Sequence, residues 1–244
     1  VMEPGRNLGF AEGNNSALRQ ALSQGADYAL LLNNDTVAAP DLVGHLVAGA
    51  ACLPRVAAAG PTIYYFDHPD TIWTAGGQVD PRSGRTVMLG LDQAGPRRSA
   101  EVRPVDFVSG CAMLIARAAL NEVGLLDPRF FTYYEEVDWC RRARRAGYQI
   151  VHVPQGRVWH KISPRERDAS PRVVYYMTRN RLLYLRSAGA SPGAWLRTLA
   201  GDYLRTLASW TLLPHWRHRR AQRDALWLGV LDYFRGRLGQ STRY

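Results

Sequence analysis

Short apolar runs alternate along the chain with stretches whose apolar residues recur every three or four positions. The apolar runs, residues 28–32, 56–60 and 148–153, are typical of strands buried inside a sheet. The stretches with helical spacing are residues 16–24, 42–51, 116–123 and 139–146. Glycine follows three of them, which is a common stop for a helix. The alternation predicts an α/β fold with a mostly parallel sheet flanked by helices.

A further strand is expected at residues 105–115, with Ser109 and Gly110 near its centre. Glycine within a strand often marks the close approach of a ligand or of another backbone. Residues 80–103 are rich in Gly, Pro and Arg, and are expected to form a mobile surface excursion.

Glycine and asparagine crowd residues 5–15, which include Asn7 and Asn14. Small residues allow a backbone to approach a ligand closely, and asparagine side chains can bond polar groups. An ordinary loop ending in a helix cap has the same composition, so both interpretations stay open at this point.

Asn33, Asn34 and Asp35 directly follow the apolar run at residues 28–32. Open α/β sheets bind ligands outside the carboxyl ends of their strands. A carboxylate there can hold Mg²⁺ or Mn²⁺ against a diphosphate, because both cations prefer oxygen ligands. A plain helix cap between strand and helix is the alternative.

The most concentrated chemistry lies in residues 130–140, where Glu135, Glu136 and Asp138 fall within four positions behind an aromatic run. Like charges this close raise one another's pKa unless cations or hydrogen bonds separate them. Folds tolerate such crowding most readily where a proton is moved. The alternative is a first helical turn, where acids favour the positive end of the helix dipole.

The net charge of +10 belongs to the last third of the chain. From Lys161 onward there are 16 Lys and Arg against 5 Asp and Glu, whereas residues 1–160 hold 15 against 16. Trp195, Leu199, Tyr203 and Leu207 recur at four-residue spacing, and an Arg-rich cluster follows at residues 217–220. Aromatics beside cations suit the headgroup region of an anionic membrane. A helical bundle packed on the rest of the protein and a dimer interface are the alternatives, and no motif supports nucleic-acid binding.

Three cysteines, at positions 52, 111 and 140, are widely spaced and form no CxxC pattern. Reduced thiols are therefore expected rather than disulfides or structural zinc. No run of about 20 apolar residues suggests a membrane span.

With these pieces in order, the chain resembles bacterial family 2 glycosyltransferases of the rhamnosyltransferase-like branch. The matching stretches are residues 7–14, 30–35, 109–115, 124–148 and 158–160. Their order along the chain makes the resemblance much more specific than any single motif. It implies an inverting enzyme with a GT-A fold.

The resemblance also implies site roles. Asp35 matches the metal-binding position of the family's DxD variant, and His160 matches the histidine that completes the metal shell. The metal would be Mg²⁺ or Mn²⁺. Glu135 and Glu136 match the Glu-Asp pair that includes the catalytic base, and Asp138 matches a further acid with an orienting role. Asn7, Asn14, Asn33, Asn34 and Gly110 are expected to contact the donor.

Position 136 departs from the family pattern, which usually has Asp there. The extra methylene of Glu136 moves the carboxylate by roughly 1.5 Å, one bond length. Glutamate can still act as a base, but the acceptor must then sit slightly differently.

Residues 1–165 are expected to form the glycosyltransferase domain, without most of the first strand–helix–strand unit that binds the nucleotide base in the family. Residues 166–244 are expected to form a basic helical region that contacts an anionic membrane. The resemblance implies transfer of a sugar, with rhamnose from dTDP-rhamnose favoured, to a cell-surface polysaccharide or lipid-linked acceptor. The expected location is cytoplasmic, on the inner face of the cell membrane. A homo-oligomer is one option for the assembly. The alternative is a non-catalytic sugar-nucleotide-binding or membrane scaffold protein that keeps the fold.

Overall fold

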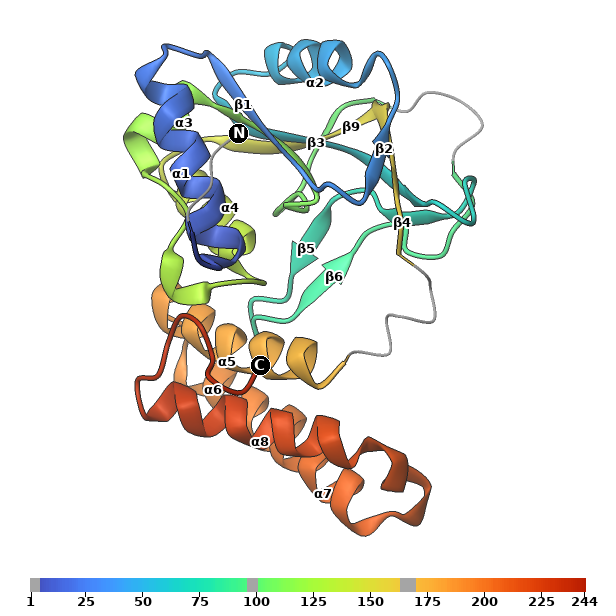
Figure 1. The fold of residues 1–244 in the computed structure, drawn as a ribbon, viewed down its shortest axis with the longest axis vertical. Coiled ribbons are helices and arrows are strands. Elements are labelled where there is room, and N and C mark those ends of the chain that lie inside the picture. Colours follow the sequence, from blue (N-terminus) through green and yellow to red (C-terminus); the bar gives the residue numbers. More distant parts are fainter. Residues whose placement is uncertain (1–4, 96–100, 163–169) are drawn as a thin grey trace.

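The computed structural model describes residues 5–95, 101–162 and 170–244 as a sheet flanked by helices, with further helices at one end (Figure 1). The strands are β1 (Tyr28–Leu32), β2 (Thr36–Ala38), β3 (Val56–Tyr65), β4 (Ile72–Thr74), β5 (Gly77–Val79), β6 (Thr86–Met88), β7 (Arg103–Pro104), β8 (Ala112–Ala116) and β9 (Gln149–His160). The helices are α1 (Gly9–Ser23), α2 (Leu42–Ala51), α3 (Arg117–Val123), α4 (Glu135–Arg145), α5 (Pro171–Ala188), α6 (Pro192–Leu196), α7 (Arg205–Leu212) and α8 (Arg220–Phe234). Short 3₁₀ helices cover Pro128–Phe130 and Pro214–Arg219, and a π-helical stretch, Arg197–Leu204, joins α6 to α7.

The central sheet has the order β1-β8-β3-β9-β2, with β4 beside β3 and β7 beside β9. The α/β class with flanking helices is as expected, but the expectation of a mostly parallel sheet is wrong. Among the described strands of this sheet, β3 and β9 run parallel, and the other pairings are antiparallel. An apolar run reports burial on both faces of a sheet, and it carries no information on the direction of the neighbouring strand.

Strand β3 is the centre of the fold, because all ten of its residues are buried. Helix α2 packs over β3 and β9 on one face, through Leu42 and Leu46. Helices α1, α3 and α4 cover the other face, as Figure 1 shows. The β5–β6 hairpin lies between this sheet and the C-terminal helices (Figure 1).

Several elements differ from their expected bounds. Helix α1 begins at Gly9, so most of the expected Gly- and Asn-rich loop is helical. Helix α4 begins at Glu135 rather than at 139, which places all three acids in its first turn. Within residues 105–115, only the part from Ala112 onward is strand. The expected excursion at residues 80–103 contains β6 and the start of β7, and its residues 96–100 lie outside the described part of the chain.

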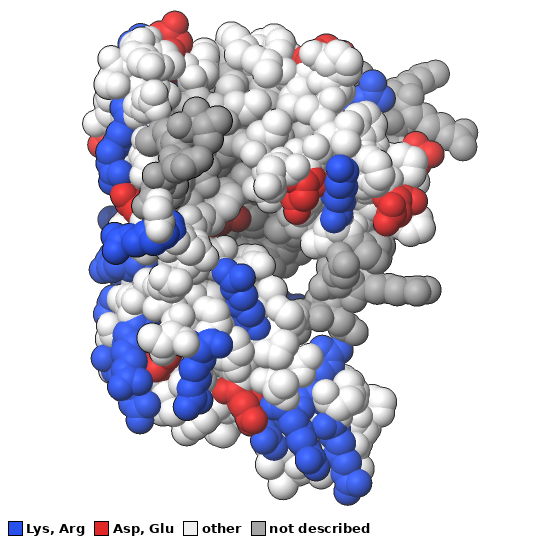
Figure 2. Space-filling view, viewed as in Figure 1, with Lys and Arg blue, Asp and Glu red and all other residues white. Residues whose placement is uncertain are grey.

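The basic C-terminal region is helical, as expected, and shares a core with the α/β part. Leu182, Tyr203 and Leu226 belong to the same apolar cluster as Leu18 and Phe130. Figure 2 shows Lys and Arg side chains gathered over these helices. In the ranges that the structure describes, no helix combines the length and the hydropathy needed to cross a bilayer.

Candidate active site

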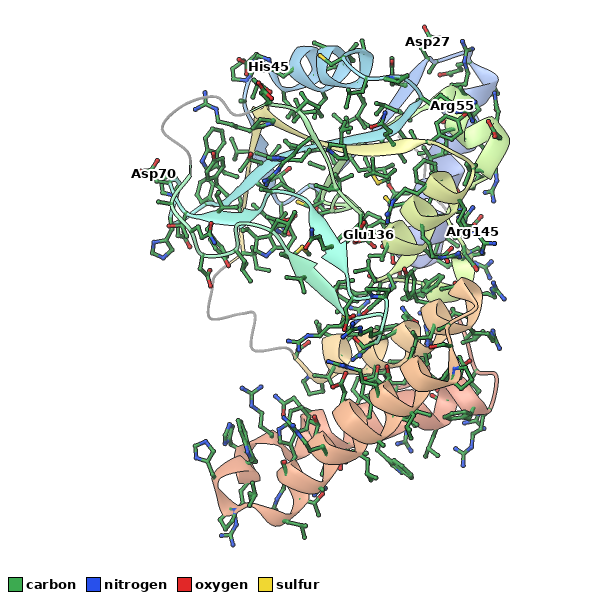
Figure 3. All side chains as sticks on the ribbon, turned by 180° about the vertical axis from the view of Figure 1, so that it is seen from behind. Asp27, His45, Arg55, Asp70, Glu136 and Arg145 are labelled. Atoms are coloured by element: carbon green, nitrogen blue, oxygen red, sulfur yellow. The ribbon has the colours of Figure 1, made fainter. Side chains whose placement is uncertain are left out.

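A cavity of about 460 Å³, called here the central cavity, opens where several strands and loops end. Its walls come from the start of α1, the turn after β1, strands β4 and β6, the loop before β8, the start of α4 and the end of β9. The lining residues are Phe10, Asn33, Asp35, Trp73, Met88, Ser109, Gly110, Cys111, Thr132, Tyr133, Glu135, Glu136, His160, Lys161 and Ile162. Asp35, Glu136 and His160, far apart in sequence, therefore face one space, as the sequence predicted. Figure 3 shows Glu136, in the first turn of α4, near the centre of the molecule.

Strand pairing brings Asp35 and His160 together. β2 and β9 are antiparallel and pair Thr36 with His160, so the residue before Thr36 falls beside the histidine. The Nε2 atom of His160 lies 3.2 Å from Oδ2 of Asp35. The His160 residue is 7% exposed, and its Nδ1 atom has no hydrogen-bond partner within the described part of the chain. The ring edge of Trp73 packs against it, with centroids 4.9 Å apart.

This pair fits a divalent cation only if the ligand supplies further donors. Within the described residues, no group of three or more His, Cys, Asp or Glu could hold a metal ion by itself. One carboxylate and one imidazole leave most positions of an octahedral shell to other oxygens. Mg²⁺ is commonly bound in this way, through one or two protein ligands together with substrate phosphates and water.

Glu135 and Glu136 are crowded and poorly solvated. Each carboxylate has one buried oxygen without a hydrogen-bond partner among the described residues. Burial and then the charge of Glu136 raise the pKa of Glu135 well above its usual range. Burial also raises the pKa of Glu136, although hydrogen bonding to the backbone of Glu136, Val137 and Gly110 opposes the shift. Hydrogen bonding from the backbone favours the ionised form of Glu136, which suits this carboxylate to accept a proton.

The turn before α4 is strained, and α5 holds it in place. Phe131, Tyr133 and Tyr134 have φ angles of 66°, 66° and 73°, values that residues with side chains rarely adopt. Asn180 of α5 is fully buried, and its side-chain amide donates to the carbonyl oxygens of Phe130, Thr132 and Tyr133 at 2.8, 2.7 and 2.8 Å. Backbone strain of this kind persists only where the surroundings fix it, and it gathers at functional sites.

Two neighbours add to this support. The buried guanidinium of Arg179 donates to the carbonyl oxygen of Phe130 at 3.1 Å and to the side-chain oxygen of Asn180 at 3.0 Å. From the other side, the Ala11 amide in the first turn of α1 donates to the Phe131 carbonyl at 3.1 Å. Gly9 is required for this approach, because a Cβ there would lie 2.4 Å from the Phe131 ring.

Asp138 does not line the central cavity, so the orienting role expected for it would act through α4 and not by contact with a substrate. Its carboxylate pairs with Arg141 at 2.8 Å and Arg142 at 2.9 Å, and it accepts a hydrogen bond from Ser187 of α5 at 2.7 Å. Burial would raise the pKa of Asp138, but these hydrogen bonds and charges outweigh burial and lower it. Asp138 follows Glu136 by two positions, which on a helix turns it away from Glu136, and its bond to Ser187 ties α4 to α5.

Of the five residues expected to contact the donor, two line the central cavity and three do not. Asn33 and Gly110 line the cavity, and a Cβ at Gly110 would lie 2.8 Å from the Phe10 ring. The other three asparagines are not among its lining residues. Asn7 accepts from the Gly9 amide at 2.9 Å, and Asn14 donates to the Phe10 carbonyl at 2.8 Å. Asn34 is exposed on the turn after β1.

Sequence reasoning missed several residues of the cavity wall. For Trp73 the sequence allows a core role, which is the favoured one, or a place on the acceptor side, and the structure puts it in the wall beside His160. Tyr133 and Lys161 also line the cavity, and each directly adjoins a recognised motif in the sequence. Adjacency to the acidic motif and to His160 is the feature that could have pointed to them. The three cysteines are free thiols, as expected. Burial raises the pKa of Cys111, in the cavity wall, to about 12.

Comparison with known proteins adds to this geometry. Residues 3–179 match the family described as "Glycosyltransferase like family 2". An N-acetylglucosaminyl-diphospho-decaprenol L-rhamnosyltransferase of Mycobacterium tuberculosis is 28% identical over 179 residues, which cover 66% of this chain and 58% of that protein. A dTDP-rhamnosyl transferase of Shigella flexneri is 23% identical over 193 residues, 75% of this chain and 61% of that protein. The chain thus spans about three fifths of the length of these relatives.

A solved structure of similar shape is a mannosyltransferase from Pyrobaculum calidifontis in complex with GDP-Man and Mn²⁺. It superposes with a TM-score of 0.50 and 14% identity, over 96% of this chain and 68% of that one. At this identity the similarity concerns the fold alone, and it agrees with the GT-A-like α/β architecture that the sequence predicted.

Proposed function

We propose, from the premise that this chain belongs to glycosyltransferase-like family 2, that it transfers a sugar from a nucleoside diphosphate donor to an acceptor hydroxyl. The observation that carries the proposal is one cavity lined by the Asp35–His160 pair and by the Glu136 carboxylate. The pair suits the diphosphate side of a donor, and the carboxylate suits the acceptor side.

The reaction is a single in-line displacement at the anomeric carbon, which inverts its configuration. Glu136 accepts the proton of the acceptor hydroxyl while that oxygen forms the new bond to the anomeric carbon. The bond from the anomeric carbon to the donor phosphate breaks, and its electron pair leaves with the nucleoside diphosphate. Asp35 and His160 would hold the divalent cation, which supplies positive charge against the leaving diphosphate. Ser109 and Gly110 line the same cavity, and their small size leaves room for the donor sugar.

The names of the relatives support a narrower assignment. Both are rhamnosyltransferases, one of them named for dTDP-rhamnose and the other for a lipid diphosphate acceptor. The donor proposed for this chain is dTDP-rhamnose, and the proposed acceptor is a cell-surface polysaccharide or a lipid-linked glycan.

The surface of the C-terminal helices favours contact with a membrane. Leu196, Leu204, Leu212 and Phe234 are 68%, 63%, 76% and 62% exposed, and Arg217 and Arg220 lie beside Leu212 in one surface pocket. Apolar side chains next to cations match the interface of an anionic bilayer. The proposed location is therefore the inner surface of the cell membrane. Among the described residues, no helix is long and apolar enough to span it.

A donor screen with the Glu136→Gln variant tests the proposal. Wild-type protein is incubated with Mn²⁺ and a panel of nucleotide sugars, and transfer to glycan acceptors is followed by mass spectrometry. Glu136→Gln should cut turnover by about 10²–10⁴-fold with little change in donor affinity. Glu122→Gln on the exposed surface of α3 is the matched control. Donor binding without transfer in the wild type would contradict the proposal and favour a non-catalytic binding protein.

A further inference from the structure

A second cavity, of about 560 Å³, adjoins the central cavity and is called here the apolar cavity. Four residues line both cavities, namely Trp73, Met88, Tyr133 and Ile162. From this shared wall the apolar cavity extends between β6 and α5, which both contribute side chains to its lining. Its size is within the range of sites that enclose small ligands.

The walls of the apolar cavity offer mainly hydrocarbon. Its apolar lining residues are Trp73, Met88, Leu91, Ile162, Val173, Val174 and Met177. Several of the polar groups around them are already bonded within the protein. The hydroxyl of Tyr134 donates to the Gly84 carbonyl at 3.0 Å, and that of Tyr203 donates to the Thr178 carbonyl at 3.1 Å.

Arg181 is also engaged, since it donates to the Ser83 carbonyl at 2.7 Å and pairs with Asp202 at 2.5 Å. Burying a sugar against such walls would leave its hydroxyls without partners, at a cost that an alkyl chain does not incur. The chemistry of the walls therefore selects a hydrocarbon chain over a carbohydrate.

The apolar cavity lies next to the acids, so a hydrocarbon chain bound in it can belong to a substrate that reaches them. Tyr133 lies in the wall shared by the two cavities, and Glu135 and Glu136 follow it within three residues. An acceptor whose hydroxyl lies at Glu136 can extend past Tyr133 into the apolar cavity only if the extending part is itself apolar. At the far side, Tyr203 lines the cavity, while the next residue, Leu204, is 63% exposed on the proposed membrane face.

We propose that the apolar cavity binds the hydrocarbon chain of a lipid-linked acceptor, while the acceptor sugar reaches Glu136 in the central cavity. This inference rests on the proposed glycosyl transfer and narrows its acceptor class. Arg85 lines the apolar cavity and has no ion pair among the residues described. Its guanidinium is suited to an anionic phosphate between the chain and the sugar.

The first test compares acceptors that differ only in their chain. N-acetylglucosaminides with methyl, octyl or dodecyl aglycones are supplied with dTDP-rhamnose, and KM is measured for each. Longer chains should lower KM, by about 3-fold or more for each buried methylene until the cavity is full. Met177→Trp should narrow the cavity and raise KM for the dodecyl acceptor about 10-fold or more, while KM for the methyl acceptor and donor affinity stay unchanged. Val87→Trp, on the exposed side of the same hairpin, is the control and should leave both acceptors unaffected.

The second test needs no turnover. A dodecyl glycoside brominated along its chain should quench the fluorescence of Trp73, and Trp73→Phe should remove that part of the quenching. Quenching without transfer to any acceptor would support chain binding and count against the proposed activity. Equal KM for methyl and dodecyl acceptors, or quenching unchanged in Trp73→Phe, would overturn the inference while leaving the activity standing.

Discussion

The side-chain amide of Asn180 donates a hydrogen bond to the carbonyl oxygen of Tyr133 at 2.8 Å, across 47 positions of sequence. The same amide bonds the carbonyls of Phe130 and Thr132, so one side chain of α5 fixes the turn that presents Glu135 and Glu136. The C-terminal region therefore supports the acidic site directly, as well as the proposed membrane contact.

Asn180→Ala is expected to lower kcat by about 10-fold or more, with donor affinity near that of the wild type. Small displacements of catalytic groups have effects of this size. The variant should also lose about 2 kcal/mol of unfolding free energy, because buried carbonyls lose their donor. Turnover and donor binding are measured well below the melting temperature of the variant.

Leu46→Ala is the control for stability in that experiment. Leu46 is fully buried in α2, on the opposite face of the sheet, and its truncation costs about 2–5 kcal/mol. If Leu46→Ala lowers kcat as much as Asn180→Ala does, the effect of Asn180 is one of stability and not of positioning.

Asp35→Ala is expected to remove the dependence of nucleotide binding on metal. In wild-type protein, titration calorimetry with dTDP should show an affinity that rises with Mn²⁺ and falls again when EDTA removes the ion. The variant should bind dTDP with the same affinity in both conditions, since one of two protein ligands is gone. Asp70→Ala, at an exposed turn, should behave as wild type. Retained Mn²⁺ dependence in Asp35→Ala would place the metal elsewhere.

The rate of transfer is expected to fall on acidification at a higher pH than an ordinary glutamate would give. Glu136 must be ionised to accept a proton, and burial raises its pKa. The acid limb of the pH profile of kcat/KM should therefore lie above about pH 4.3, the usual pKa of glutamate. An acid limb at or below that pH would assign the base to another group.

Asp138→Asn is expected to lower the free energy of unfolding by about 3 kcal/mol near pH 7, because it breaks a buried ion pair. The pKa of Asp138 is lowered in the folded protein. Its stabilising contribution is therefore present above about pH 4, the usual pKa of aspartate, and is lost as the pH falls through the lowered value. Urea denaturation should show the gap between variant and wild type closing on acidification.

Glu135→Gln should show the opposite dependence on pH. The pKa of Glu135 is raised, so its protonated form contributes stability that is full below about pH 4.3 and is lost as the pH rises through the raised value. The glutamine variant keeps the neutral form at every pH, and it should become more stable than wild type as the pH rises. Equal pH dependence of the Asp138→Asn and Glu135→Gln curves would contradict the two opposite pKa shifts.

Replacing Arg217 and Arg220 by glutamate is expected to weaken binding to vesicles that contain anionic lipid. Each basic residue near such a surface contributes about 1 kcal/mol, or roughly 5-fold in affinity, and the effect should shrink as salt screens the charges. Flotation of wild type and variant with anionic and neutral liposomes measures this. Arg145→Glu, on the exposed surface of α4 in Figure 3, is the control. Equal flotation with neutral and anionic lipid would exclude the electrostatic contact.

The sequence by itself determined the α/β class, the positions of most helices and the residues that could carry chemistry. Helical spacing and glycine stops are local properties, so the helices at residues 42–51 and 116–123 were predictable. The ordered motifs likewise pointed to Asp35, Glu136 and His160, which do line one cavity in the folded chain.

Tertiary structure alone decided the strand directions, the side toward which individual side chains point, and the hydrogen bonds that hold the site in place. Apolar runs specify burial and not a partner, so the antiparallel pairing of β1 with β8 could not be read from residues 28–32. Asp138 follows Glu136 by two positions, but helical geometry turns it toward Ser187 and away from the central cavity. The role of Asn180 depends on contacts 47 to 50 positions away, and no local pattern encodes a contact over such a distance.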